Sequence, residues 1–192
     1  MKERLVRGTN VASVLRALRS EGRLRPLPEL TDWERDLMRR RISPSTWYAV
    51  KVFDSLLQLV HRFVYDGSEA AAQTMGRRYA KEGLVDHREL FLVPDDPLAT
   101  LARLPARWRE QYNFAEVHIT PLSGHNDEHG ARIRINGFPD MSACHGHAVM
   151  GLSAELAEQA GARLTKLHLE ERPWMHNSVL TYTLTWARPG AE

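Results

Sequence analysis

The chain has little of what disulfide-linked, membrane-spanning or polyanion-binding proteins need. It contains one cysteine, so no disulfide can form within the chain, and this fits a reducing compartment. No apolar run approaches the roughly 18 residues of a membrane-spanning helix, and the N-terminal stretch MKERLVRGTNVASVLRAL lacks the apolar core of a secretory signal. The net charge is only +2, which argues against a bulk polyanion binder. We therefore expect a soluble, cytoplasmic protein with no membrane partner.

Basic residues are concentrated in two short runs, at positions 16–25 and 38–41. Runs of this kind are typical of solvated helix faces. The sequence shows no helix-turn-helix with a basic recognition helix, and aromatic residues do not alternate with the basic ones. Nucleic acid is therefore not an expected partner.

The first half of the sequence has the 3.6-residue periodicity of helices. One helix is predicted to open on the capping box Thr31–Glu34, a second to be capped by Ser45, and a third to end at Gly83. Asp96 precedes Pro97 in a further helix start. The three helices are predicted over 31–40, 46–65 and 68–82.

In the second half the period changes from 3.6 to 2, which is typical of strands. Four alternating segments flank one helix that is predicted from Ser142 to about Ala160. The order is β-β-α-β-β, an antiparallel sheet of four strands with one helix across it, whose apolar face needs the N-terminal helices as a second layer. The prediction is one α+β domain over 1–192, with a helical part at 1–105 and a sheet part at 106–192. The polar sheet face is either solvated or a partner surface.

The segment DMSACHGHAVMG, at positions 140–151, has the strongest chemical character in the sequence. Cys144 and His147 are three apart and could share a helix face, with His168 or Glu170 supplied by the neighbouring strand. A thiolate with imidazoles and a carboxylate favours zinc. The helix dipole would lower the pKa of Cys144. However, Cys144 and His145 point about 100° apart on a helix, so they form a poor catalytic dyad.

His145 has a different expected position. It is in helical register with Val149, Leu152 and Leu156, which places it on the buried stripe of the helix. The small residues of the same helix would let a ligand or another backbone approach closely; they are Ala143, Gly146, Ala148 and Gly151. We expect a ligand pocket between the long helix and the sheet, with the His145 turn at its mouth and lined by Tyr48, Val52 and Leu56.

Several segments also carry a family resemblance. VRGTNVASVLRAL, STWYAVKVFDSLLQLV, DGSEAAAQTMGRRYAKEGL and GARLTKLHLEE resemble a myxobacterial paralogous family of unknown function, about 190 residues long. The C-terminal part, GLSAELAEQAG followed by YTLTW, resembles 4-vinyl-reductase-type and haem–nitric-oxide-binding-like domains. These resemblances imply a domain that holds a small ligand between helices and sheet, often as a homodimer and often in signalling proteins.

The resemblance also bears on cofactors. The haem-binding members carry a Tyr-x-Ser-x-Arg motif that is missing here, so haem is not expected. Zinc-bearing relatives carry a cysteine at the head of the helix, a place that Cys144 fills, and further cysteines that this chain lacks. The expectation is therefore no cofactor, with zinc as the alternative.

Three functional hypotheses follow. The first is a non-enzymatic regulatory domain that binds a small-molecule ligand or a protein partner, with a homodimer as the expected assembly. The second is a metal sensor or metal-dependent enzyme centred on Cys144 and nearby histidines. The third is a structural adaptor without ligand.

Overall fold

The computed structural model describes residues 3–24, 31–123, 128–175 and 177–187. The helices are α1 (Gly8–Leu24), α2 (Asp32–Arg39), α3 (Val50–Phe63), α4 (Glu69–Phe91), α5 (Pro97–Leu101), α6 (Leu104–Gln111) and α7 (Ala143–Gln159). The strands are β1 (Leu5–Arg7), β2 (Trp47–Ala49), β3 (Glu116–Ser123), β4 (Glu128–Asn136), β5 (Arg163–Glu171) and β6 (Val179–Ala187).

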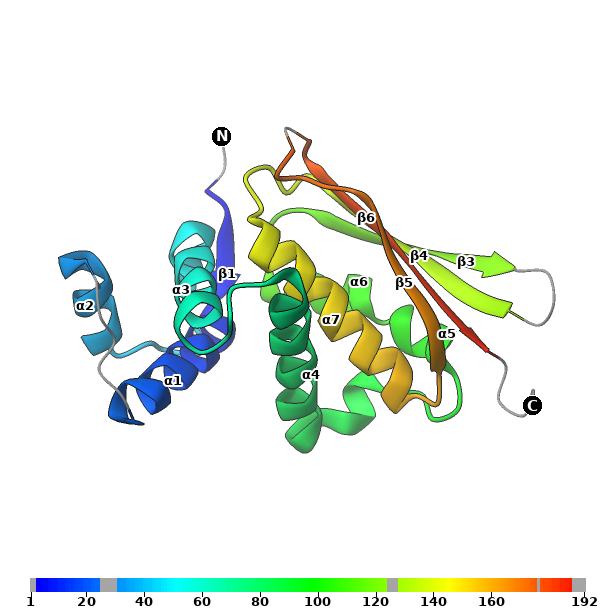
Figure 1. The fold of residues 1–192 in the computed structure, drawn as a ribbon, viewed down its shortest axis with the longest axis horizontal. Helices are drawn as coiled ribbons and strands as arrows, with labels where there is room; N and C mark the ends of the chain where they lie inside the picture. Colours follow the sequence, from blue (N-terminus) through cyan, green and yellow to red (C-terminus); the bar gives the residue numbers. More distant parts are fainter. Residues whose placement is uncertain (1–2, 25–30, 124–127, 176, 188–192) are drawn as a thin grey trace.

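The elements are arranged in two groups along the long axis of the molecule. At one end, α1, α2 and α3 lie beside the short antiparallel pair of β1 and β2 (Figure 1). At the other end lies a four-stranded sheet with the strand order β3-β4-β6-β5, in which all neighbours are antiparallel. The prediction of mixed helix and sheet with a four-stranded antiparallel sheet is confirmed.

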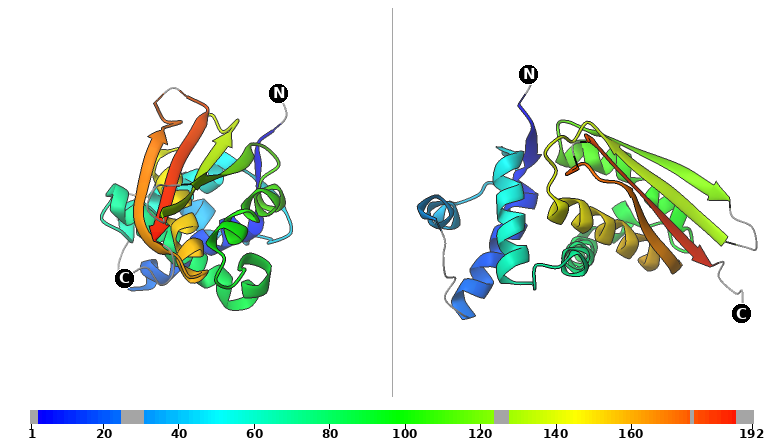
Figure 2. Two further views of the ribbon diagram at one scale, coloured as in Figure 1. Left: turned by 90° about the vertical axis from the view of Figure 1, so that its right-hand side faces the viewer. Right: turned by 45° about the horizontal axis from the view of Figure 1, so that its top comes forward.

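The helix α7 covers one face of the sheet, and α4 packs against α7 (Figure 2). Ser153 of α7 and Tyr182 of β6 link helix and sheet through hydroxyls 2.7 Å apart. The N-terminal helices α1 and α3 pack on each other at the end of this stack, and α3 meets α7 near Ser142. The layer nearest the sheet is thus α7, the helix expected from Ser142, while α1 and α3 lie at the end of the stack.

The alternation in the strands separates a core face from a solvent face. On the core face, the side chains of Ile133, Ile135, Leu180, Tyr182 and Leu184 are almost completely buried. They belong to one continuous apolar cluster that also includes side chains of α1 and α3. The sheet and the N-terminal helices therefore share a core.

Most helix starts follow the sequence signals. Thr31 and Glu34 form the reciprocal capping box of α2. Ser68 caps α4 by accepting a hydrogen bond from the Ala71 N–H at 3.1 Å. Asp96 caps α5 in the same way.

Two predicted helix boundaries are wrong. Ser45 does not cap the long helix, because residues 47–49 form β2 and α3 begins only after Ala49. Gly83 does not end α4, which continues to Phe91. Burial of Leu84 next to Leu156 explains this, because the apolar contact with α7 outweighs the low helix propensity of one glycine. Among the described residues, no helix is both long enough and apolar enough to cross a bilayer.

Candidate functional site around His145

The first turn of α7 carries the candidate site. Ser142 caps the helix, since its hydroxyl accepts a hydrogen bond from the His145 N–H at 3.2 Å. The same hydroxyl donates to Oδ1 of Asp54 on α3 at 2.7 Å. The cap therefore joins the N-terminal helices to α7 at the place where the two groups of elements meet.

The His145 side chain is only 2% exposed, and polar groups face both of its ring nitrogens. Nδ1 lies 3.4 Å from Oδ1 of Asp54, a distance of ionic contact whose geometry falls short of a hydrogen bond. On the other side, Nε2 lies 3.1 Å from the Tyr112 hydroxyl. The imidazole is thus held between a carboxylate on α3 and a phenol that directly follows α6.

Aromatic rings enclose this chain of polar groups. The rings of Phe53 and Phe138 meet the His145 ring edge-on, with centroids 5.3 and 5.0 Å away. Trp108 stacks on Tyr112 at 4.3 Å, and Phe114 packs against both Tyr112 and Phe138. Asp54, His145 and Tyr112 thus form a polar triad inside an apolar shell. Electrostatic interactions within this triad are stronger than in water.

The environment shifts two pKa values in this triad. Burial alone would raise the pKa of Asp54, but the contacts with His145, Ser142 and Gln58 outweigh it, and the pKa lies below its ordinary value of 3.8. Burial, and then the Asp54 charge, raise the pKa of Tyr112. At neutral pH the triad therefore holds an ionised Asp54 and a protonated Tyr112.

Cys144 faces α3 and is buried. Its thiol donates to the Leu57 carbonyl at 3.7 Å. Burial, together with the Asp54 charge, raises its pKa to about 12. The expectation of a lowered pKa is therefore wrong, because loss of solvent outweighs the helix dipole. The thiol is a buried hydrogen-bond donor in this structure.

His147 lies on another face of α7, 3% exposed and packed against the ring of Trp174. Its Nδ1 lies 3.4 Å from the Gln73 amide nitrogen, and its Nε2 lies 3.4 Å from a Glu69 carboxylate oxygen. Both partners belong to α4. Burial lowers the pKa of His147, with Glu69 acting in the opposite direction.

The three residues considered for zinc are not brought together. Cys144 faces α3 and His147 faces α4, while His168 is exposed on β5. His168 alternates with Leu167 and Leu169, which pack against the core, so it belongs to the face of the sheet turned away from α7. Across the part of the chain that the structure describes, no three His, Cys, Asp or Glu side chains form a group that could hold a metal ion.

The residues expected to line a pocket beside His145 mostly lie elsewhere. Tyr48 lies in β2 and accepts a hydrogen bond from the Ser43 N–H. Leu56 is completely buried in the core and Val52 is partly buried. On α3, the side chains that contact the His145 turn are instead Phe53 and Asp54, one or two helix positions away. Of the four expected residues, His145 is the one that occupies the site.

Cavities at the surface of the described part of the chain include two that are lined by residues other than those around His145. One, of about 270 Å³, lies between α4 and the end of α7 and is lined by Lys81, Leu84, Val85, Arg88, Leu92 and Gln159. The other, of about 480 Å³, lies near the start of α1 and is lined by Arg7, Thr9, Pro44, Ser45, Glu110 and Gln111.

The small residues of α7 make room for α4 and for one aromatic ring. A side-chain carbon on Gly151 would lie 2.0 Å from the Gln73 carbonyl oxygen, and one on Gly76 would lie 1.8 Å from the Ala148 carbonyl oxygen. At Gly146 the same carbon would meet the Trp174 ring. Close packing explains these three glycines.

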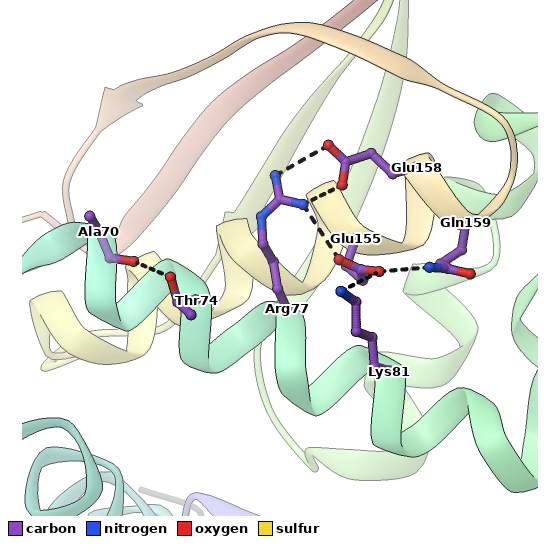
Figure 3. Close-up of polar contacts among 7 residues, drawn as sticks. All are labelled: Ala70, Thr74, Arg77, Lys81, Glu155, Glu158 and Gln159. Carbon is purple, nitrogen blue, oxygen red and sulfur yellow. Dashed lines mark hydrogen bonds and ion pairs between the residues drawn. The ribbon is translucent and has the colours of Figure 1, made fainter. Parts of the chain in front are cut away.

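Charged side chains extend the same contact between α4 and α7 (Figure 3). Arg77 pairs with Glu158 and lies 3.5 Å from the buried Glu155. Lys81, at 3.6 Å, and Gln159, at 2.8 Å, also reach the Glu155 carboxylate. Glu155 is thus compensated from three sides, which burial of a charge requires. Together the glycines and the ion pairs hold α7, and with it His145, in a fixed position.

Sequence reasoning missed two members of the triad, Asp54 and Tyr112. One signal was present for Asp54, since it is an acidic residue within the apolar helix segment VFDSLLQLV. Tyr112 gave no local signal, because its contact with His145 depends on how α6 and α7 meet in three dimensions.

No family model and no curated protein sequence matches this chain. Solved structures do match. The unliganded Fe(II) H-NOX protein from K. algicida has a TM-score of 0.62 and 12% identity, covering 97% of this chain and 99% of its own. The Fe(II)NO form of an H-NOX protein from S. oneidensis has a TM-score of 0.59 and 11% identity, covering 93% and 97%. The chain shares the H-NOX fold. The resemblances to a myxobacterial family and to 4-vinyl reductases stay predictions.

The H-NOX neighbours overturn one prediction. From the sequence we expected no cofactor, with zinc as the alternative, and did not expect haem, because the Tyr-x-Ser-x-Arg motif is missing. That prediction is wrong: the neighbours include proteins described by their Fe(II) states and by the distortion of their haem, and they match over nearly the whole chain.

The residues of this chain can be compared with the needs of a haem. A haem iron requires an axial donor such as imidazole, within surroundings that exclude water. His145 supplies a buried imidazole, and Phe53, Phe138 and Trp108 supply the apolar surroundings. The donor chemistry therefore fits. The Tyr112 hydroxyl lies 3.1 Å from Nε2, and the surrounding rings are buried against one another, so these side chains would have to move apart to admit a haem.

Proposed function

We propose that this chain is a non-enzymatic sensory domain that binds a small ligand at the His145 triad, and that haem is the ligand. The observation that carries the proposal is the buried imidazole of His145, whose Nε2 faces a single phenol inside an aromatic shell. The H-NOX fold supports the choice of haem, since its solved members include Fe(II) and NO-ligated forms.

The residues of the site would have distinct tasks. His145 would hold the haem iron through an imidazole nitrogen, and the rings of Phe53 and Phe138 would exclude water from the site. Tyr112, whose hydroxyl lies 3.1 Å from Nε2, would have to turn away to make this nitrogen available. A bound haem would supply an iron centre at which a small diatomic molecule can bind.

The site lies where a ligand could influence the whole molecule. Asp54 comes from α3, Ser142 and His145 come from α7, and Tyr112 forms a β-bridge with Val6 of β1. Displacement of the Tyr112 side chain would therefore change contacts in both groups of elements. A sensor needs such a site, where ligand binding favours one of two arrangements of the molecule.

Titration with haem under reducing conditions tests the proposal. We expect a Soret absorption change that saturates at one haem per chain, and its loss in a His145→Ala variant. The matched control is His118→Ala, which removes an exposed histidine on β3 and should leave the titration unchanged. An absent or unsaturable Soret change in the wild type, or an unaltered titration in His145→Ala, would contradict the proposal.

A further inference from the structure

We propose that the hollow between α4 and the end of α7 is a second binding site, which takes a small amphipathic carboxylate such as the anion of a medium-chain fatty acid. The hollow measures about 270 Å³, close to the lower end of the range for small-molecule pockets, which is roughly 300 to 1,000 Å³. It is lined by residues other than those of the His145 triad. The inference therefore goes beyond the proposed function and does not depend on it.

One face of α4 supplies most of the hollow. Four of the lining residues follow one another at spacings of four, three and four positions, which places them on the same side of the helix; they are Lys81, Val85, Arg88 and Leu92. Leu84 and Leu92 are buried in the apolar cluster that α4 shares with the end of α7, so they form the floor. Val85 is 81% exposed, more than any other large apolar side chain among the described residues. The hollow thus combines an apolar floor with an apolar side chain that faces solvent.

The two cationic side chains at the hollow have different surroundings. The Lys81 ammonium lies 3.6 Å from the buried Glu155 carboxylate (Figure 3), so its charge is already engaged. Arg88 is exposed, and among the side chains that the structure describes, none pairs with its guanidinium. Arg88 is therefore the group that can bind an anion in this hollow.

The cation and the apolar side chains together define the ligand. A guanidinium binds a carboxylate through two parallel hydrogen bonds. An apolar chain on that carboxylate would lie against Leu84, Val85 and Leu92 and shield them from water. A small polar anion would leave these side chains uncovered, and a neutral hydrocarbon would leave Arg88 without a partner. A protein partner needs about 800 Å² of surface on each side, whereas the apolar part of this hollow consists of three side chains.

Titration of the full-length chain with sodium octanoate, followed by NMR of the backbone amides, tests this inference. We expect saturable shifts that are confined to residues 81–92 and to the end of α7. Hexanoate should bind more weakly and acetate not measurably, because each CH₂ group that is buried raises the affinity by up to about fourfold. Shifts spread over the whole molecule, or equal affinity for the three carboxylates, would overturn the inference.

Two substitutions separate the charge from the apolar contact. Arg88→Ala should weaken octanoate binding about three- to tenfold through loss of the charged hydrogen bonds, and Val85→Ser about threefold through loss of apolar contact. The matched control is Arg78→Ala, which removes another exposed arginine of α4, paired with Glu82, and should leave the affinity unchanged. The three replaced side chains are exposed, so we expect all variants to fold. Unchanged affinity in Arg88→Ala or Val85→Ser, or an equal loss in Arg78→Ala, would overturn the inference.

The variants also keep this inference apart from the proposed function. Octanoate binding should persist in His145→Ala, and haem binding should persist in Arg88→Ala, because the two sites share no residue. Loss of octanoate binding in His145→Ala would place the fatty acid at the triad and overturn the second site. A wild type that binds octanoate but no haem would refute the proposed function alone.

Discussion

At the scale of single residues, the surroundings of a side chain decide its chemistry more than its neighbours in the sequence do. Cys144, His145 and His147 lie within four positions of one another, and Cys144 and His147 suggested a shared metal site, while His145 was expected on the buried stripe of the helix. The helix points them at α3, at Tyr112 and at α4. Each has a separate environment, and each therefore gives a separate prediction.

We expect Cys144 to resist thiol reagents while the protein is folded. With a pKa of about 12, only about one thiol in ten thousand is ionised at pH 8, and the sulfur is buried. Mass spectrometry after iodoacetamide treatment should show label on Cys144 in denaturant and almost none in buffer. Rapid labelling of the folded chain would show that the turn opens or that the thiol is activated.

His147 should make the protein less stable in mild acid. Its pKa is lowered in the folded state, so below the ordinary value of 6.5 the unfolded chain takes up the proton more readily than the folded one. The contribution of neutral His147 is complete above pH 6.5 and is lost as the pH falls. Urea unfolding of wild type and His147→Gln between pH 7.5 and 5 should show the wild type losing more stability. Parallel curves would contradict this.

At the scale of elements, the contact between α4 and α7 depends on glycine. Gly151→Ala would place a carbon 2.0 Å from the Gln73 carbonyl oxygen, so the helices must separate. We expect the free energy of unfolding to fall by about 1–3 kcal/mol. Gly83→Ala, in the exposed and unobstructed part of α4, should raise it by up to about 1 kcal/mol. Chemical denaturation of both variants measures the difference, and equal effects would show that α4 and α7 are not packed this closely.

The elements themselves were largely predictable. Ser68 and Asp96 mark helix starts through local hydrogen bonds, and the alternation around Ile133 and Ile135 marks a half-buried strand. These signals are local, so the sequence contains them. The passage of α4 through Gly83 was not predictable, because it depends on the contact with Leu156, far away in the chain.

At the scale of the whole molecule, the meeting of α3, α6 and α7 creates the candidate site. His145 was predictable as a buried residue from its helical register. Asp54 and Tyr112 were not, since they reach it from elements 91 and 33 residues away in the chain. The missing motif argued against haem, whereas neighbours that share the fold are described as haem proteins, a likeness that no local pattern in the sequence reveals.

Native mass spectrometry tests the central claim most directly. The wild-type chain and His145→Ala would be produced side by side in cells supplied with a haem precursor and weighed without denaturation. We expect the wild type to carry one haem per chain and His145→Ala to carry none. A wild type without haem, or equal haem content in both proteins, would contradict the claim that His145 is the centre of a haem-binding sensory site.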